Sequence, residues 1–183
     1  KNNITVSTIE HAMAALYASE IDNCLIHIKI PEFPILDGSA RLYIENIMQV
    51  GIEEQSAEKD YYIIRNKVEI TDEESGSSII ALPDDHFSVS TMVLFNSPIL
   101  NYQYACLEDM KNFPEEIAAA RTFVFVREIE PLLKNNLIKG GDLDNAIVIY
   151  DHKIEQSEFD RIADLVGVSH KNADELGLSL IHI

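Results

Sequence analysis

Residues 21–28 read IDNCLIHI, and residues 143–149 read LDNAIVI. Each stretch places an apolar residue and an Asp-Asn pair before a run of branched side chains, a pattern typical of a β-strand after a turn. Elsewhere in the chain, helical and strand patterns come in separated runs. This order favours an α+β fold over a doubly wound parallel sheet. The similarity between the two stretches also indicates an internal duplication.

Helices are predicted on both sides of the first stretch. Apolar side chains recur at helical spacing over residues 10–19, after Ser7 or Thr8 as a capping residue. A second helix is predicted over residues 40–50. The strand between these helices is predicted over residues 24–28.

The rest of the chain divides at a polar segment. Residues 53–60 (EEQSAEKD) carry no apolar periodicity and are expected to link two domains, residues 1–52 and residues 61–177. Residues 178–183 (LSLIHI) match the translated end of a transposon adapter common in sequencing libraries, so we expect a non-native tail there. In the second domain, strands are predicted over residues 61–70, 78–82, 87–95 and 145–150, and helices over residues 113–120, 127–134 and 155–166.

Charge and composition exclude several classes of function. The chain of 183 residues has 14 Lys and Arg against 31 Asp and Glu, a net charge of −17. Such a charge repels phosphate backbones and anionic lipid, which disfavours nucleic acid or a membrane surface as partner. No run approaches the roughly 18 apolar residues of a membrane span. Cys24 and Cys106 lie in apolar surroundings and are predicted to be buried thiols of a reducing compartment, the cytoplasm.

Two places in the sequence could carry catalysis. Glu10 and His11 put a carboxylate and an imidazole in the first turn of a helix, as a metal-bound water and its general base require. A surface Glu beside a half-buried His is the plain structural alternative. Thr122 presents a hydroxyl beside Phe123 and Phe125, which share one face of a strand and could equally be core residues.

Five ordered blocks together resemble one enzyme family. They are residues 6–11 (VSTIEH), 21–23 (IDN), 34–40 (PILDGSA), 121–125 (RTFVF) and 140–146 (GGDLDNA). This set is similar to the UDP-3-O-acyl-N-acetylglucosamine deacetylases of lipid A biosynthesis. The longer linker and residues 135–141 (NNLIKGG) resemble most the subgroup fused to a downstream 3-hydroxyacyl-[acyl-carrier-protein] dehydratase.

The resemblance implies a zinc amidase that releases acetate from UDP-3-O-acyl-N-acetylglucosamine. It implies two similar two-layer α/β sandwich domains with the active site between them, both incomplete in this chain. His11 matches the first zinc ligand, Glu10 the general base and Thr122 the oxyanion-stabilising hydroxyl. The positions that match the substrate site and its acyl-chain passage, or are plain core, are Phe123, Phe125, Val126, Ile129, Ile138, Ala146 and Val148.

The resemblance implies further zinc ligands, which we expect to lie outside this sequence. They lie in a His-Lys-x-x-Asp motif, and the general acid is a later His; Asp160 and Asp164 are interpreted as part of the helix that precedes that motif. We therefore expect an internal fragment that is inactive by itself. Two alternatives stay open, a noncatalytic acidic binding domain and an enzyme whose metal ligands are His11, Asp160 and Asp164.

Overall fold

The computed structural model describes residues 4–135, 137, 141, 144–150 and 155–166. Its helices are α1 (Glu10–Ala18), α2 (Arg41–Val50), the 3-10 helix η1 (Met110–Asn112), α3 (Phe113–Glu116), α4 (Val126–Lys134) and α5 (Gln156–Val166). Its strands are β1 (Val68–Thr71), β2 (Ser78–Ala81), β3 (Val89–Leu94), β4 (Tyr102–Leu107), β5 (Phe123–Phe125) and β6 (Ile147–Ile149). Helices and small sheets are mixed, which confirms the predicted α+β class.

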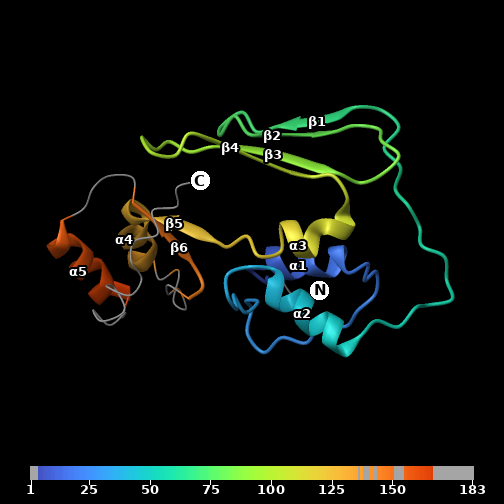
Figure 1. Cartoon of the computed structure of the whole chain (residues 1–183), viewed down its shortest axis with the longest axis horizontal. Coiled ribbons are helices and arrows are strands. Elements are labelled where there is room, and N and C mark those ends of the chain that lie inside the picture. Colours follow the sequence, from blue (N-terminus) through green and yellow to red (C-terminus); the bar gives the residue numbers. More distant parts are fainter. Residues whose placement is uncertain (1–3, 136, 138–140, 142–143, 151–154, 167–183) are drawn as a thin grey trace.

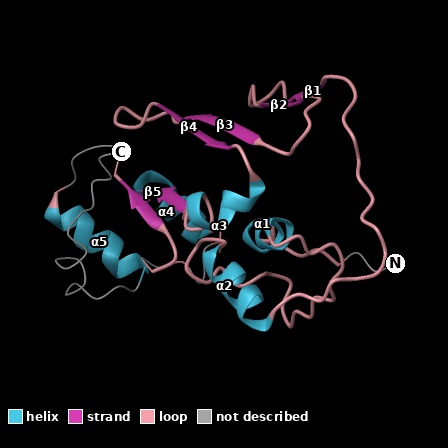
Figure 2. Ribbon diagram, turned by 45° about the vertical axis from the view of Figure 1, so that its right-hand side comes forward, coloured by secondary structure: helices cyan, strands magenta, loops and turns pink. Residues whose placement is uncertain are grey.

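Two groups of elements gather at different places in the molecule. Helices α1, α2 and α3 lie together, and β5, β6, α4 and α5 form a second group beside them (Figures 1 and 2). The antiparallel pairs β1–β2 and β3–β4 run along one side of the molecule (Figure 1). No helix among the described residues is long and apolar enough to cross a bilayer.

The first group packs around small side chains of α1. Ala15 is fully buried, which lets α1 approach α2, where Ile44 fills the contact. Leu107 at the end of β4 and Phe113 at the start of α3 complete this first core cluster. The β3–β4 hairpin is therefore held to the helices mainly by its last residue.

The second group is a βαβ unit. Strands β5 and β6 pair in parallel, with Phe123 opposite Ile147, and α4 joins them in sequence. The second core cluster consists of Val126 and Ile129 of α4 with Ile162 of α5. Helices α4 and α5 lie within about one residue of the helices predicted over residues 127–134 and 155–166.

Several local predictions are wrong. Residues 24–28 form no strand, because none of the described strands pairs with them, and Leu25 remains 84% exposed. The strand predicted over residues 61–70 is limited to Val68–Thr71, which alone faces a partner, β2. Neither predicted cap bonds the start of α1, since Ser7 and Thr8 donate instead to Pro31 and Glu32, respectively.

Candidate active site

The side chains of His11 and Thr122 meet although 111 positions separate them. The Nε2 atom of His11 lies 3.0 Å from the Oγ1 atom of Thr122, and both residues are half-buried. His11 is held by the first turn of α1, and Thr122 immediately precedes β5. The structure thus brings together two of the three residues that the sequence singled out for catalysis.

The backbone of Thr122 is held on both sides. Its N–H donates to the Gly38 carbonyl oxygen at 2.7 Å, and its own carbonyl accepts from the N–H of Ile147 at 2.8 Å. The first bond reaches the loop before α2, and the second continues the β5–β6 ladder. Thr122 therefore lies at the junction of the two groups of elements.

The loop that receives Thr122 is a turn built by Asp37 and Gly38. The Asp37 carboxylate accepts from the Ser39 hydroxyl at 2.9 Å and from the Arg41 guanidinium at 3.0 Å. Burial raises the pKa of the Asp37 carboxyl, but the bonds from Ser39 and Arg41 outweigh it, so the net pKa is lowered. Arg121 closes the junction by donating from Nε to the Asp37 carbonyl oxygen at 3.0 Å.

Gly38 occupies a position that only glycine fits. Its φ is +77°, and a Cβ atom there would lie 1.9 Å from the carbonyl oxygen of Asn145. Asn145 is itself buried, before β6. Blocks 6–11, 34–40, 121–125 and 140–146 of the sequence thus all contribute residues to this one place.

Glu10 lies beside His11 on the first turn of α1 and is exposed. Burial, and next the charge of Glu10, raise the pKa of the Tyr43 hydroxyl. The Tyr43 hydroxyl donates to the Pro34 carbonyl oxygen at 2.5 Å. The role of Glu10 as the general base stays a prediction.

The aromatic residues predicted to line the substrate site differ in exposure. Phe123 is 44% exposed, whereas Phe125 is buried. Both rings lie edge-on to Phe95, with centroids 5.3 and 5.9 Å away. Phe123 is thus the ring of this pair that a ligand could reach.

The apolar residues predicted for the acyl-chain passage lie mostly in the second core cluster. Val126 and Ile129 are buried there, and Val148 packs against them half-buried. Ala146 is half-buried just before β6, and Ile138 lies outside the described residues. In this structure Val126 and Ile129 act as core, and their role toward an acyl chain stays a prediction.

The described residues do not fit a complete zinc centre at His11. A catalytic zinc needs three protein ligands, and the only set of three or more suitable side chains found together in that part of the chain is Asp84, Asp85 and His86. His11, Asp160 and Asp164 do not form such a set, so the alternative metal site on these residues is wrong. No catalytic step through a metal follows from the residues described.

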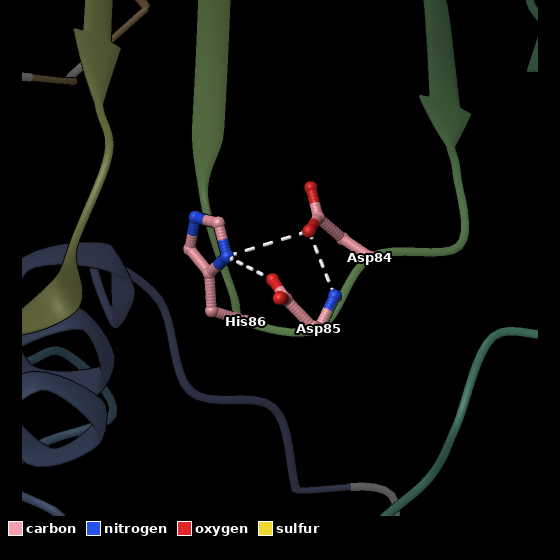
Figure 3. Close-up of side chains that lie close together, drawn as sticks. All are labelled: Asp84, Asp85 and His86. Carbon is pink, nitrogen blue, oxygen red and sulfur yellow. Dashed lines mark hydrogen bonds and ion pairs between the residues drawn. The ribbon is translucent and has the colours of Figure 1, made fainter.

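The Asp84, Asp85 and His86 set is an exposed ion-paired turn (Figure 3). His86 Nδ1 lies 2.6 Å from an Asp85 oxygen and 3.3 Å from an Asp84 oxygen. The hydrogen bond to Asp85, followed by the charge of Asp84, raises the pKa of the His86 imidazole. These contacts account for the cluster as a local turn before β3.

The sequence did not assign roles to Gly38, Arg121 or Asn145. The signal that could have found Gly38 is the block 34–40 (PILDGSA), whose Asp-Gly pair marks a turn with positive φ. The prediction that both cysteines are buried is wrong, since Cys24 is exposed and Cys106 half-buried, and both are free thiols.

Comparison with known proteins matches this chain to one family. The family model described as UDP-3-O-acyl N-acetylglycosamine deacetylase matches residues 1–182. A relative from Bacteroides thetaiotaomicron named "Bifunctional enzyme LpxC/FabZ" is 62% identical over 97% of this chain, and one of the same name from Porphyromonas gingivalis is 55% identical over 97%. A relative from Geotalea uraniireducens named "UDP-3-O-acyl-N-acetylglucosamine deacetylase" is 38% identical over 97% of this chain and 57% of its own length.

The chain spans 38% of the length of the two bifunctional relatives. The match of the family model over nearly every residue nevertheless includes all the blocks that meet at Thr122. The chain therefore belongs to the UDP-3-O-acyl N-acetylglycosamine deacetylase family.

Proposed function

We propose that this chain is part of a deacetylase that hydrolyses the acetamide of UDP-3-O-acyl-N-acetylglucosamine, a step of lipid A biosynthesis. The observation that carries the proposal is the 3.0 Å contact between His11 Nε2 and Thr122 Oγ1. The activity named for relatives such as the Geotalea uraniireducens protein supports the substrate. The matching blocks supply a candidate general base, one metal ligand and a donor to the oxyanion, which are part of what an amide hydrolase needs at one carbonyl group.

In the proposed reaction, water adds to the acetyl carbon, the C–N bond breaks, and acetate leaves a free amine on the sugar. Glu10, exposed beside His11, accepts the proton of the attacking water. The Thr122 hydroxyl donates a hydrogen bond to the oxygen on which negative charge develops. Because Phe123 is exposed next to Thr122, its ring is the surface against which the sugar or acyl chain packs.

Zinc is part of this proposal, with His11 as one of its ligands. When bound, zinc would lower the pKa of a water molecule and polarise the acetyl carbonyl. The described residues offer one imidazole beside Thr122. Residues 170–174 (HKNAD) have the His-Lys-x-x-Asp pattern but lie outside the described residues. Because the chain spans only 38% of the length of the bifunctional relatives, we infer that the other ligands belong to parts of the relatives that it does not match. Isolated, the 183-residue chain is then expected to hold less than one zinc after dialysis and to release no acetate.

We also propose the domain organisation of the whole protein and the compartment in which it acts. The names of the two bifunctional relatives support a dehydratase fused downstream. The boundary near residues 53–60 between two sandwich domains is proposed from the polar sequence of that segment. Residues 53–60 contain no helix or strand and are exposed, as expected of a linker. The free thiols Cys24 and Cys106 support a reducing compartment, so we place the reaction in the cytoplasm.

The test is acetate release from UDP-3-O-acyl-N-acetylglucosamine by the full-length protein that contains this chain. Glu10→Gln is expected to lower kcat by about 10²- to 10⁴-fold, because it removes the base without changing side-chain size. Thr122→Val is expected to lower kcat by about 10- to 10³-fold through loss of one donor to the oxyanion. His11→Gln is expected to abolish activity and tight zinc binding together.

Matched controls are available in exposed loops. Glu54→Gln and His27→Gln make the same chemical changes away from Thr122 and are expected to leave kcat unchanged. Full activity of the Glu10→Gln variant would refute the proposed base. Stoichiometric zinc in the isolated chain would refute the inference that the other ligands come from elsewhere.

A further inference from the structure

The contact between His11 and Thr122 joins elements that do not share a core. Helix α1, which carries His11, packs in the first core cluster through Ala15. Strand β5, which follows Thr122, packs in the second cluster through Val124. Packing inside either cluster therefore does not fix the 3.0 Å distance between the two side chains.

The bonds that cross between the two groups converge on one turn. The Gly38 carbonyl accepts from the N–H of Thr122 at 2.7 Å, and the Asp37 carbonyl accepts from Nε of Arg121 at 3.0 Å. The backbone of Asn145 lies directly against Gly38, where a Cβ atom would stand 1.9 Å from its oxygen. Two hydrogen bonds, one from the backbone of residue 122 and one from the side chain of residue 121, therefore hold this part of the chain against the turn.

The receiving turn is itself stiffened. The Asp37 carboxylate accepts from the backbone N–H of Ser39 at 3.2 Å, from its hydroxyl at 2.9 Å and from Arg41 at 3.0 Å. Ser39 is fully buried. A turn closed by its own side chain keeps the Asp37 carbonyl aimed at the Arg121 guanidinium and the Gly38 carbonyl aimed at the N–H of Thr122.

We propose that Arg121 is a positioning residue, which, by holding the turn of Asp37 and Gly38, sets the Thr122 hydroxyl against His11. The Nε atom of the guanidinium donates to the backbone carbonyl of Asp37. Loss of this bond frees the 121–122 peptide to shift, and the side chain of Thr122 shifts with it. The effect of Arg121 on catalysis rests on the proposed function, whereas its effect on the distance between Thr122 and His11 does not.

The experiment is solution NMR of the 183-residue chain without metal or substrate. Two quantities are followed, the ¹⁵N shift of His11 Nε2, assigned by its loss in His11→Gln, and the amide exchange rate at residue 122. Thr122→Val defines the reference, because it removes the hydroxyl and keeps the backbone N–H. It is expected to move the His11 shift and leave the exchange rate unchanged.

Arg121→Met is expected to change both quantities. The His11 shift should move toward the Thr122→Val value, and amide exchange at residue 122 should rise about two- to tenfold as the bond to Gly38 weakens. Arg121→Lys should restore part of the wild-type shift, since its ammonium group also donates to a carbonyl. Arg65→Met, at an exposed position before β1, is the matched control and should leave both unchanged.

A second pair of variants covers the case in which Arg121→Met does not fold. Asp37→Ala removes the acceptor that closes the turn, whereas Asp37→Asn keeps an oxygen for Ser39. A changed His11 shift and faster exchange in Asp37→Ala, with smaller changes in Asp37→Asn, support the proposal. A folded Arg121→Met chain, or a folded Asp37→Ala chain, with wild-type values of both quantities overturns it. That result would leave the deacetylase proposal intact, and a failed acetate assay would leave this geometry intact.

Discussion

Gly38→Ala is expected to destabilise the chain more than the same change at Gly76. Both glycines have positive φ, +77° and +72° respectively. They differ in their surroundings, because a Cβ atom at Gly38 would overlap the Asn145 carbonyl oxygen, whereas nothing lies within 4 Å of that position at Gly76. The pair therefore separates the cost of backbone conformation from the cost of the close approach.

The conformational cost is common to both variants. An L-residue in the left-handed region costs about 1–2 kcal/mol, and the smaller entropy of the unfolded alanine chain offsets part of this in each case. A Cβ atom at 1.9 Å from Asn145 forces the backbone apart, which adds about 1–3 kcal/mol of overpacking at Gly38 alone. For a chain of this size, that difference corresponds to a melting temperature roughly 2–12 °C below that of Gly76→Ala.

The assay is thermal unfolding followed by circular dichroism at one protein concentration and scan rate. Equal melting temperatures for Gly38→Ala and Gly76→Ala would refute the argument that the Asn145 backbone requires glycine at position 38.

Further changes test the core, the ion-paired turn and the thiols. Ile44→Ala should lower the free energy of unfolding by about 2–5 kcal/mol in urea titration, while the exposed Met48→Ala should change it by less than about 0.5 kcal/mol. The bond to Asp85 raises the pKa of the His86 imidazole. The protonated imidazole therefore stabilises the fold fully below the pKa of His86 in the unfolded chain, and this stabilisation is lost as pH rises through the pKa in the folded chain. His86→Gln should remove this pH dependence of the melting temperature. Cys24, the more exposed thiol, should react with a thiol reagent before the other one, as mass spectrometry of the labelled peptides would show.

Helices were predictable from this sequence because their stabilising contacts are largely periodic. Apolar spacing located α1, α2 and α5 to within about two residues, which is the usual uncertainty of helix ends. Strands were less predictable, because a strand needs a partner that its own sequence does not name. Residues 24–28 have the composition of a strand, but none of the described strands pairs with them. Strand β4 is the opposite case, because it pairs with β3 but was not predicted from the sequence.

In the candidate site, too, some residues were predictable from the sequence and others only from their partners in the fold. Glu10, His11 and Thr122 were found by resemblance of ordered blocks, since no periodicity links positions 111 residues apart. The roles of Gly38 and Arg121 depend on which backbone carbonyl lies opposite them, and this information exists only in the folded chain. The Asp-Gly pair of residues 37–38 is typical of a turn, but it does not indicate which residues dock on that turn.

The position of the site between two core clusters has a consequence for how mutations act. Packing free energy resides in side chains such as Ile44 and Ile129, each inside one cluster. The distance between His11 and Thr122 depends instead on a few directional bonds that cross between the clusters. A hydrogen bond contributes only about 1 kcal/mol of net stability, yet it fixes direction closely. Changes at Arg121 should therefore alter the geometry of the site at little cost in stability, and changes at Ile44 should do the reverse.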